Sequence, residues 1–449
     1  MVLDKLNNLA DKKYIVPIAM AIIFLASIFY SFYYKIELVA DAKAYNSIAL
    51  NILAGSGFKE QGSDTPILFD RAIQRAGPAY EYLLAGIYAV FGHHYEAVWV
   101  IQALLHVLTA WLIFKICQKV FLESGRSIGL VAALIFGLHP DLIEISAMLM
   151  TETLYLFTIT LVFYIFLLVF EKSSSLFLAF FLAAALALSI YSRPTVVLFV
   201  PVIFGFYLIR KNYLALSVCL LVMIVLMTPW TWRNWKIYNQ FIPTTLIGQY
   251  NIWLGNTATS DGGQWVGNYN PWNDFAAERG FSEVKEKANQ EFKNFVFQHP
   301  INFIKLTLIR FTRYFSLIRP MGFWFYQTGL SQAFFSGLSG IFIALLFISG
   351  WSGVFLAARQ KKPLYYYLII LAITAPLPLL ITVVQSRYRF QVYPFLAIFG
   401  AYAIIYWLNK RNWWKEKVFL FPAASLLFIS LIDVFMSVDK IIMRLKSFF

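Results

Sequence analysis

The sequence is poor in charge and in cysteine. Only 13% of its 449 residues are charged and 60% are hydrophobic, whereas soluble domains carry roughly 25% charged residues. Lipid is therefore the main solvent that this chain is adapted to. Its two cysteines, Cys117 and Cys219, fall within apolar segments, which argues against a disulfide framework and against a thiolate metal site. The sequence also contains no Walker loop, no HExxH motif and no serine nucleophile elbow.

The positive net charge of +14 does not indicate a nucleic-acid partner. The lysines and arginines lie at the ends of apolar segments, which fits lipid phosphates and membrane topology better than a nucleic-acid groove. The first apolar run, residues 14–34, is as long as a bilayer span and lacks a small-residue cleavage site. We therefore expect an anchor and not a cleaved signal peptide.

Long apolar segments predict an all-α polytopic membrane protein. After the first span, further spans are predicted at residues 97–120, 128–148, 151–170, 176–191, 196–209, 214–229, 335–357, 364–383, 390–408 and 418–436. Residues 80–91 are too short to cross a bilayer, and Lys305, Arg310 and Arg313 interrupt residues 301–315. We expect both stretches to form interfacial helices. We expect a bundle of about 11–13 transmembrane helices with interfacial helices in the outer loops.

Three regions are expected along the chain. Residues 1–229 form an N-terminal transmembrane module that includes a first outer loop, 35–96. Residues 230–332 are polar and aromatic and form a large outer loop, and residues 333–449 form C-terminal transmembrane helices. Compact basic clusters, such as the one at Lys410 and Arg411, mark the cytoplasmic side. The first outer loop then faces the periplasm or the exterior of a cell membrane.

A short helix is predicted at the start of that outer loop. Ala44, Ile48 and Ile52 recur every four residues and share one helical face. Asp41 stands at the positive N-terminal end of this helix. The structural alternative is a plain juxtamembrane helix with a favourable N-terminal acid.

Ionisable side chains from distant parts of the chain gather on the same face. The acids are Asp41 and Glu152, and the arginines are Arg75, Arg193, Arg233, Arg387 and Arg389. Charged groups at a membrane are costly and are functional candidates. Guanidinium groups bind phosphate oxygens in pairs, so this set suits a reaction in which a phosphate leaves while a hydroxyl or amine attacks.

Each of these residues also has a structural alternative. Glu152 could cap its helix. Arg193 precedes a helix that begins with proline, and its long side chain could place the guanidinium group at the membrane interface. Arg233 could anchor an aromatic belt. Arg387 and Arg389 could bind lipid headgroups.

The order of motifs resembles that of integral-membrane GT-C glycosyltransferases. The likeness is nearest to the group of bacterial glycosyltransferase family 39, protein O-mannosyltransferases and aminoarabinose transferases. The motifs are Asp41-x-x-x-Tyr45, Arg75-x-x-Pro78-x-Tyr80, Met150-Thr-Glu152-Thr, Ser192-Arg193-Pro194, Pro229-Trp-Thr-Trp-Arg233-Asn, Gly248-Gln-Tyr-Asn251 and Arg387-Tyr-Arg389. Two departures are Ala42, where many relatives have a second acid, and the three-residue step from Arg75 to Pro78.

The resemblance implies transfer of a sugar from a polyprenyl-phosphate carrier to an acceptor outside the cytoplasm, with inversion. It implies catalytic roles for Asp41 and Glu152. It implies binding of the lipid phosphate by Arg75, Arg193, Arg233 and Arg387, and of substrate by Tyr45, Tyr80 and Arg389. The implied partners are the lipid-linked sugar, membrane lipids and an acceptor lipid, glycan or protein. No cofactor is required by these motifs, and a divalent metal is left open.

A flippase or transporter of lipid-linked sugars is the main alternative. Transporters place ionisable residues near mid-membrane and often show paired repeats or broken helices. Here the predicted spans carry little charge at mid-depth, and the ionisable groups lie at one edge. This distribution favours chemistry at the membrane surface.

Overall fold

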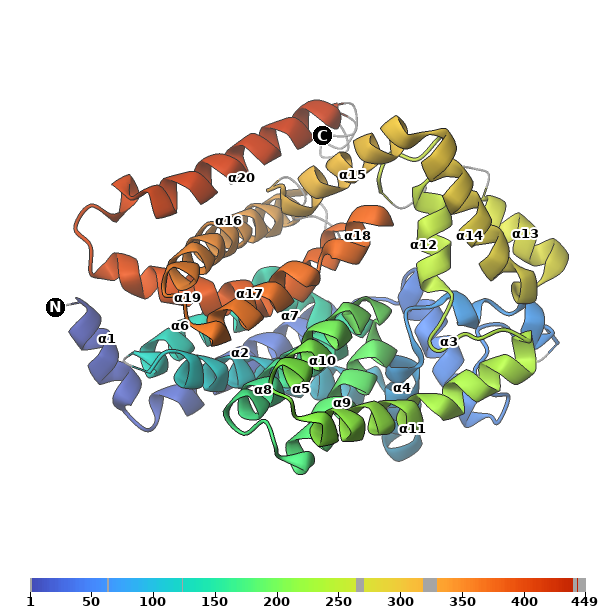
Figure 1. Cartoon of the computed structure of the whole chain (residues 1–449), viewed down its shortest axis with the longest axis horizontal. Helices are drawn as coiled ribbons and strands as arrows, with labels where there is room; N and C mark the ends of the chain where they lie inside the picture. The colour runs from blue at the N-terminus through green and yellow to red at the C-terminus, as the bar shows by residue number, and fades with distance from the viewer. Residues whose placement is uncertain are drawn as a thin grey trace.

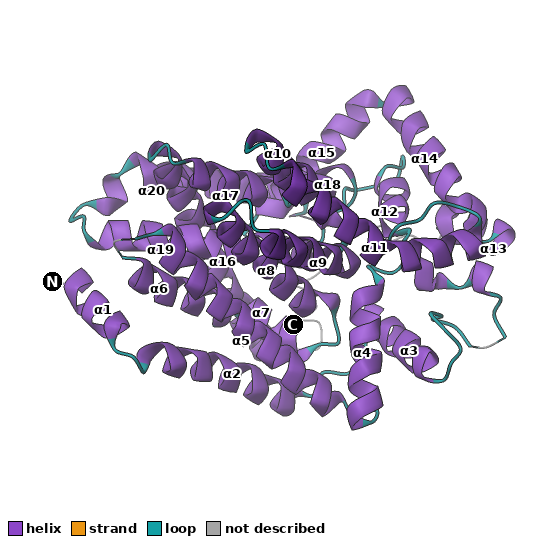
Figure 2. Cartoon of the chain, turned by 60° about the horizontal axis from the view of Figure 1, so that its bottom comes forward, coloured by secondary structure: helices purple, strands orange, loops and turns teal. Residues whose placement is uncertain are grey.

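The computed structural model describes residues 2–62, 64–122, 124–263, 270–317, 329–438 and 442. Within these residues every regular element is a helix (Figure 2). The predicted all-α polytopic class is confirmed. The chain is a bundle of long apolar helices with a group of shorter helices at one end (Figure 1).

The first half of the chain supplies most of the bundle. Its α-helices are α1 (Val2–Asp11), α2 (Ile15–Tyr34), α3 (Asp41–Leu53), α4 (Pro78–Phe91), α5 (Tyr95–Val120), α6 (Gly125–Gly137), α7 (Pro140–Ala147), α8 (Thr151–Glu171), α9 (Leu176–Ser192), α10 (Phe199–Ile209) and α11 (Tyr213–Tyr238). Short 3-10 helices are η1 (Ile67–Phe69), η2 (Arg71–Gln74) and η3 (Pro194–Leu198).

The second half adds an outer lobe and completes the bundle. The lobe holds α12 (Ile247–Gly255), α13 (Pro271–Arg279), α14 (Phe281–Gln298) and α15 (Pro300–Phe315). The bundle is completed by α16 (Gly329–Arg359), α17 (Pro363–Thr374), α18 (Leu377–Ile381), η5 (Ser386–Val392), α19 (Tyr393–Leu408), η6 (Trp413–Lys415) and α20 (Lys417–Met436).

Eight helices of the described chain are long and apolar enough to cross a membrane. The bent pair α6 and α7 is a ninth candidate, and α9 and the stretch Pro194–Ile209 are shorter apolar helices. The lower end of the expected range of about 11–13 transmembrane helices is reached only if the bent pair, α9 and Pro194–Ile209 also cross the membrane. Neither α4 nor α15 is a candidate span, as predicted; their interfacial position stays a prediction.

One predicted span is broken in the described part of the chain. Residues 128–148 divide into α6 and α7, with a bend of 56° between them. The break lies at His139–Pro140, where the proline ring disfavours a helical conformation in the residue before it. Residues 196–209 and 390–408 begin in the short helices η3 and η5, and each forms a single apolar helix with the α-helix that follows. The apolar run continues across His139–Pro140, so hydropathy alone did not reveal that break.

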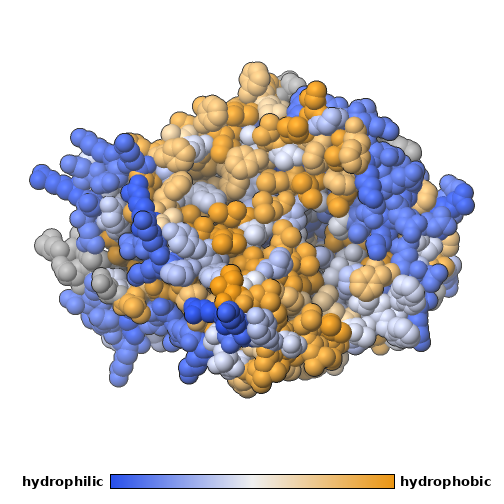
Figure 3. Space-filling model, viewed as in Figure 1, coloured by the Kyte–Doolittle hydropathy of each residue, from blue (hydrophilic) through white to orange (hydrophobic). Residues whose placement is uncertain are grey.

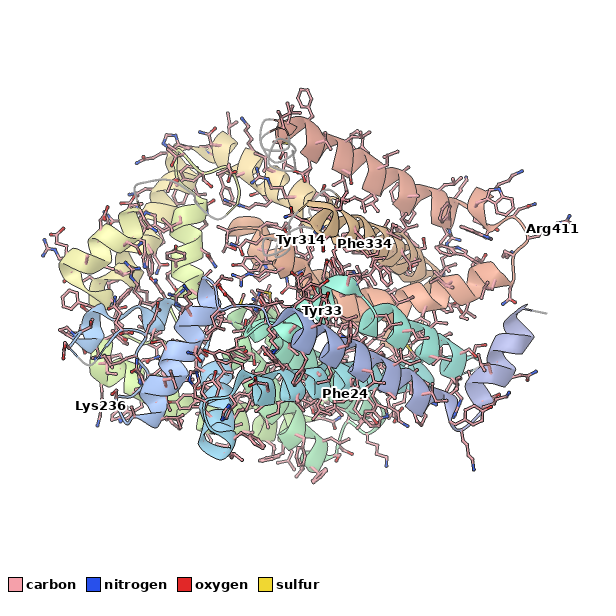
Figure 4. All side chains as sticks on the ribbon, turned by 180° about the vertical axis from the view of Figure 1, so that it is seen from behind. Phe24, Tyr33, Lys236, Tyr314, Phe334 and Arg411 are labelled. Carbon is pink, nitrogen blue, oxygen red and sulfur yellow. The ribbon has the colours of Figure 1, made fainter. Side chains whose placement is uncertain are left out.

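Polar residues gather at the two ends of the molecule, and a broad apolar band lies between them (Figure 3). Lys236 and Arg411 lie at these opposite ends (Figure 4). Large apolar side chains remain exposed on the outer helices α2, α11 and α20, among them Phe29, Leu221 and Phe435. Such a band is the surface that a hydrocarbon core covers. The protein is therefore a multi-pass membrane protein.

The outer lobe has a hydrophobic cluster of its own. Trp272 of α13 is fully buried there, with Trp253 of α12 and Phe281 and Val284 of α14 around it. Ile73 of η2 joins the same cluster. The lobe lies at the same end of the molecule as α3 and α4 (Figure 1). Its packing fixes α12 and η2 next to each other.

Candidate functional site

Asp41 is the first residue of α3, where the helix dipole favours an acid. Ala42, Tyr45 and Ala49 bury one face of α3 in the main hydrophobic cluster. The preceding residue, Ala40, has φ 45° and ψ −119°, a backbone conformation that residues other than glycine rarely adopt. Strain of this kind is often found at functional sites. It directs the chain sharply into the helix at Asp41.

The Asp41 carboxylate accepts hydrogen bonds from two arginines that are remote in the sequence. Arg75 Nη1 lies 3.1 Å from Oδ1, and Arg387 Nη2 lies 2.6 Å from Oδ2. Arg387 comes from η5, near the other end of the chain. The predicted convergence of Asp41, Arg75 and Arg387 on one site is therefore present in the structure.

Glu152 extends this cluster on the side of α8. It lies in the first turn of α8 and accepts a hydrogen bond from Arg193 Nη2. Its Oε1 also lies 3.6 Å from Arg387 Nε, so Arg387 lies between the two acids. Glu152 is 1% exposed, and the arginines stand between it and the open space described below. Asp41, Glu152, Arg75, Arg193 and Arg387 thus form one connected network.

Glu60 is a member of this network that the sequence did not indicate. Its carboxylate accepts from Arg75 Nε at 2.6 Å and from Arg75 Nη2 at 2.5 Å. The buried Asp70 carboxylate fastens the surrounding loop by accepting from the backbone N–H groups of Glu60 and Gln61, at 2.8 and 2.9 Å. In the sequence, Glu60 is only one charged residue in a polar loop, so no pattern singled it out.

Two glycines allow close approaches that bring the site together. A Cβ at Gly77 would lie 2.0 Å from the Tyr191 carbonyl oxygen, so only glycine lets the start of α4 approach the end of α9. This contact places Arg75 near Arg193. A Cβ at Gly255 would lie 2.1 Å from the Thr382 carbonyl oxygen. The end of α12 is thereby closed against the segment that follows α18.

A cavity of about 670 Å³ opens beside the network. Asp41, Tyr45, Arg75, Arg193 and Arg387 line its charged end. An apolar part is lined by Val197, Leu198, Leu377, Leu379, Leu380 and Ile381. A third part of the lining comes from η2 and α12 and includes Gln74, Tyr250 and Asn251. The cavity therefore combines cations, apolar groups and uncharged polar groups.

Four of the predicted site residues lie outside the cavity lining. Glu152 lies behind the arginines. Tyr80 is fully buried; its hydroxyl donates to Gln102 Oε1 at 2.7 Å and its ring packs edge-on to Tyr45. Their roles in catalysis or substrate binding stay predictions, as do those of the lining residues.

Arg233 and Arg389 are the other two. Arg233 stacks over Trp230, 4.8 Å from the ring centre, and donates to the Phe58 carbonyl oxygen at 3.3 Å. Arg389 is buried and donates to the Ser316 carbonyl oxygen at 2.6 Å. The contacts of Arg233 suit its structural alternative, an anchor in an aromatic belt. Arg389 is too buried to bind a lipid headgroup and does not reach the cavity, so its contacts are those of a structural residue.

Charge in the network is balanced, with Asp41, Glu60 and Glu152 facing Arg75, Arg193 and Arg387. Burial alone would raise the pKa of Asp41. The positive charges of Arg387, Arg75 and Arg193 outweigh that effect and hold the pKa below its ordinary value. Asp41 is therefore ionised at neutral pH and is a weak base. It is suited to orienting groups more than to taking up a proton.

The donor set of this site does not fit a metal ion. The carboxylates of Asp41, Glu60 and Glu152 are all engaged by guanidinium groups. Within the described residues no group of three or more histidine, cysteine, aspartate or glutamate side chains could hold a metal.

The site thus joins a cationic end to an apolar wall within a bundle of membrane-spanning length. Residues 75–232, well under half of the chain, match the family model of dolichyl-phosphate-mannose-protein mannosyltransferases. By sequence, no curated protein matches the chain.

Solved structures match over nearly the whole chain. The apo oligosaccharyltransferase of Archaeoglobus fulgidus has a TM-score of 0.54 and 16% identity, covering 95% of this chain and 55% of that one. The same enzyme, AglB, in complex with an inhibitory peptide and a dolichol-phosphate gives the same values. Its complex with zinc and sulfate has a TM-score of 0.52 and 14% identity, covering 93% and 52%.

ArnT from Cupriavidus metallidurans, bound to undecaprenyl phosphate, has a TM-score of 0.49 and 16% identity, covering 87% of this chain and 60% of that one. The chain spans little more than half the length of these proteins. It has the GT-C fold of membrane glycosyltransferases, as its motifs implied.

Proposed function

We propose that the protein is a glycosyltransferase that takes a sugar from a polyprenyl-phosphate carrier. It transfers that sugar to a hydroxyl or amine of a lipid, glycan or protein acceptor at the non-cytoplasmic membrane face. The observation that carries the proposal is the cavity, in which Arg193 and Arg387 stand at one end and an apolar wall continues from them.

The apolar wall suits the prenyl chain of such a carrier. Val197, Leu377 and Ile381 line the cavity, yet they are 51%, 43% and 40% exposed. In a chain with this fold, apolar side chains that are both cavity-lining and exposed favour a lateral opening toward lipid. A prenyl chain leaving through this opening would place its phosphate beside the arginines.

Arg193 and Arg387 are the best candidates for binding that phosphate. Three donors of Arg75 are engaged by the Glu60 oxygens and by Asp41. Arg387 donates to Asp41 and to Gln385 and lies 3.6 Å from Glu152, and exchange of its Asp41 contact would turn one N–H group toward a phosphate oxygen. Arginine forks bind phosphate with two parallel hydrogen bonds. Arg193 and Arg387 would also stabilise the charge that develops on the leaving phosphate.

The reaction balances without a cofactor. The acceptor N–H or O–H attacks the anomeric carbon, and the bond from that carbon to the phosphate oxygen breaks with its electron pair. The products are the glycosylated acceptor and the polyprenyl phosphate. The acceptor proton ends on the released phosphate or in water. Because arginines depress the pKa of Asp41, we assign Asp41 to orienting the acceptor and the arginines.

Two comparisons support this proposal. The matching family model is named for enzymes that use dolichyl-phosphate mannose, and a protein of similar fold forms a complex with a dolichol-phosphate. The non-cytoplasmic location rests on the basic loops at the end opposite to Asp41. Nothing in the site favours the flippase alternative, because the ionisable network lies at one end of the bundle.

The test is transfer from labelled lipid-linked sugars by the full chain in nanodiscs. The donors are undecaprenyl phosphates that carry glucose, mannose or galactose, and mass spectrometry of cell-envelope lipids and glycans with and without the protein identifies the acceptor. Arg387→Gln should abolish both binding of undecaprenyl phosphate and transfer. The matched variant Arg233→Gln, outside the cavity, should retain them. Equal behaviour of the two variants, with folding verified, would contradict the proposal.

A further inference from the structure

One wall of the cavity carries polar groups without charge. Gln74 ends η2, and Tyr250 and Asn251 lie in α12. A backbone hydrogen bond of 2.7 Å from Leu246 N–H to the Ile73 carbonyl oxygen joins these two segments. Gln74 directly precedes Arg75. The uncharged wall therefore adjoins the charged end of the cavity.

The Gln74 amide has a fixed orientation. Trp272 Nε1–H, from the fully buried indole at the centre of the outer lobe, donates to Gln74 Oε1 at 2.7 Å. The indole can only donate, so the amide oxygen must face it. Among the described residues, Gln74 Nε2 has no hydrogen-bond partner, and it is not sealed from the cavity. Gln74 thus presents two N–H donors to the open space.

Tyr250 and Asn251 extend this wall. The Tyr250 ring packs edge-on against Trp272, with ring centres 5.3 Å apart. In the part of the chain that the structure describes, no residue hydrogen-bonds to the Tyr250 hydroxyl or to the Asn251 amide. The wall therefore offers an amide donor, a phenol and a second amide, all unused and all uncharged.

Each of the three walls matches one chemical part of a lipid-linked sugar. A phosphate requires cations and a prenyl chain requires apolar contacts, and the cavity supplies each in a different place. Hydroxyl groups of a sugar require neutral donors and acceptors in fixed positions. We propose that Gln74, Tyr250 and Asn251 form the subsite that holds the sugar of the lipid-linked donor, with Trp272 as a positioning residue. This inference rests on the proposed function.

The test compares binding of undecaprenyl phosphate with binding of its glucosyl, mannosyl and galactosyl forms to the full chain in nanodiscs. Wild-type protein should bind at least one sugar-bearing lipid more tightly than the bare lipid. Gln74→Leu should weaken that binding about 10-fold, as loss of buried donors to substrate hydroxyls does, and should change bare-lipid affinity less than two-fold. Gln360→Leu, directly after the end of α16, is the matched control and should change neither.

Trp272→Phe tests the positioning role, because it keeps an aromatic core but removes the donor that orients Gln74. It should raise the KM for the sugar-bearing donor a few-fold and leave kcat unchanged. A folded Gln74→Leu protein that keeps the full preference for a sugar-bearing lipid would overturn the inference. So would a wild-type protein without any such preference, or an effect on acceptor KM alone.

The proposed function fails in a different way. In that case wild-type protein does not bind bare undecaprenyl phosphate and Arg387→Gln changes nothing, whatever Gln74 does.

Discussion

The charged wall and the uncharged wall of the cavity are built in different ways. The charged wall gathers Asp41, Arg75, Arg193 and Arg387 from four separate parts of the chain, and ion pairs hold these residues to one another. The uncharged wall comes from two adjoining segments, and the core of the outer lobe supports it from behind. The side-chain positions in the charged wall depend on one another, whereas those in the uncharged wall depend on the packing of the outer lobe.

This difference predicts unequal responses to substitution. Removing one partner of an ion pair leaves the other charge uncompensated, which costs about 3–5 kcal/mol in a fully buried pair and less in the partly buried pairs of this wall. Tyr250 and Asn251 make no hydrogen bond with the described residues, so removing their polar groups loses only contact with substrate. Gln74 also accepts from the buried Trp272 indole, so its loss adds the cost of one unsatisfied buried donor, about 1–3 kcal/mol. Substitutions in the charged wall should therefore lower both stability and activity, whereas those in the uncharged wall should lower activity more than stability.

Arg387→Lys should produce the largest effect. Lysine keeps the charge but loses the planar fork that contacts Asp41 and lies near Glu152. We expect sugar transfer to fall about 100- to 1,000-fold, and the thermal midpoint in detergent to fall as well. Initial rates with labelled donor and a thermal scan measure both. Retention of transfer within a few-fold would mean that the arginine serves only as a point charge.

Asp41→Asn should follow, with a loss of about 100-fold in transfer through lost positioning of the acceptor and the arginines. The amide keeps the shape of the side chain but cannot balance two guanidinium charges. Because the arginines hold the pKa of Asp41 below its ordinary value, wild-type Asp41 stays ionised throughout mildly acidic pH. The pH profile of the residual activity should therefore match the wild-type profile between pH 5 and 8. A new pH dependence in Asp41→Asn would instead assign Asp41 to proton transfer.

The charged wall could be predicted from the sequence to a large extent. Charge is costly in a membrane protein, so each arginine at a helix end stands out against its apolar surroundings. The motifs around Asp41, Arg193 and Arg387 then placed these residues on one face. Glu60 was not found, because its loop is polar throughout and its pairing with Arg75 depends on how Asp70 folds that loop.

The uncharged wall could not be predicted in the same way. Gln74 and Trp272 are separated by nearly half of the chain, and neither is unusual where it stands in the sequence. Their hydrogen bond results from packing of the outer lobe. The break at His139–Pro140 was missed for a related reason, since apolar character continues through it. Hydropathy predicts whether a segment lies in lipid or in water, but it does not predict where its backbone bends.

Glu60→Gln should have an intermediate effect on the charged wall. Glu60 holds two donors of Arg75, so its loss frees Arg75 to move away from Asp41. We expect transfer to fall about 10-fold, mainly through a higher KM for the lipid-linked donor. The matched control is Glu96→Gln, an exposed acid at the start of α5, which should behave as wild type. An unchanged KM would show that Arg75 needs no support from Glu60.

Arg233→Gln should change transfer less than about three-fold. Arg233 contacts Trp230 and the backbone at Phe58, and it lies outside the cavity lining. Its loss should lower the thermal midpoint slightly through the lost stacking. A loss of transfer as large as that of Arg387→Lys would extend the charged wall beyond the cavity, and would restore the phosphate-binding role that the motifs imply.

Glu81→Gln should have the smallest effect on transfer and a distinctive effect on stability. Glu81 of α4 is fully buried, and its carboxylate oxygens have no hydrogen-bond partner among the described residues. Burial raises the pKa of Glu81 to about 8, although the charge of Arg75 opposes this and those of Asp41 and Glu60 add to it. The folded protein therefore holds a proton on Glu81 at neutral pH, whereas the unfolded chain releases it above pH 4.5.

The sign of the pH dependence follows from this difference. Between pH 4.5 and about 8 the folded state binds more protons than the unfolded state, so stability falls as pH rises, by at most about 5 kcal/mol in total. Glutamine cannot ionise and removes this slope. The thermal midpoint of Glu81→Gln should exceed that of wild type increasingly from pH 5 to pH 8, while Glu96→Gln follows wild type. Parallel curves for Glu81→Gln and wild type would mean that Glu81 is ionised in the folded protein, and that the charged wall includes a further acid.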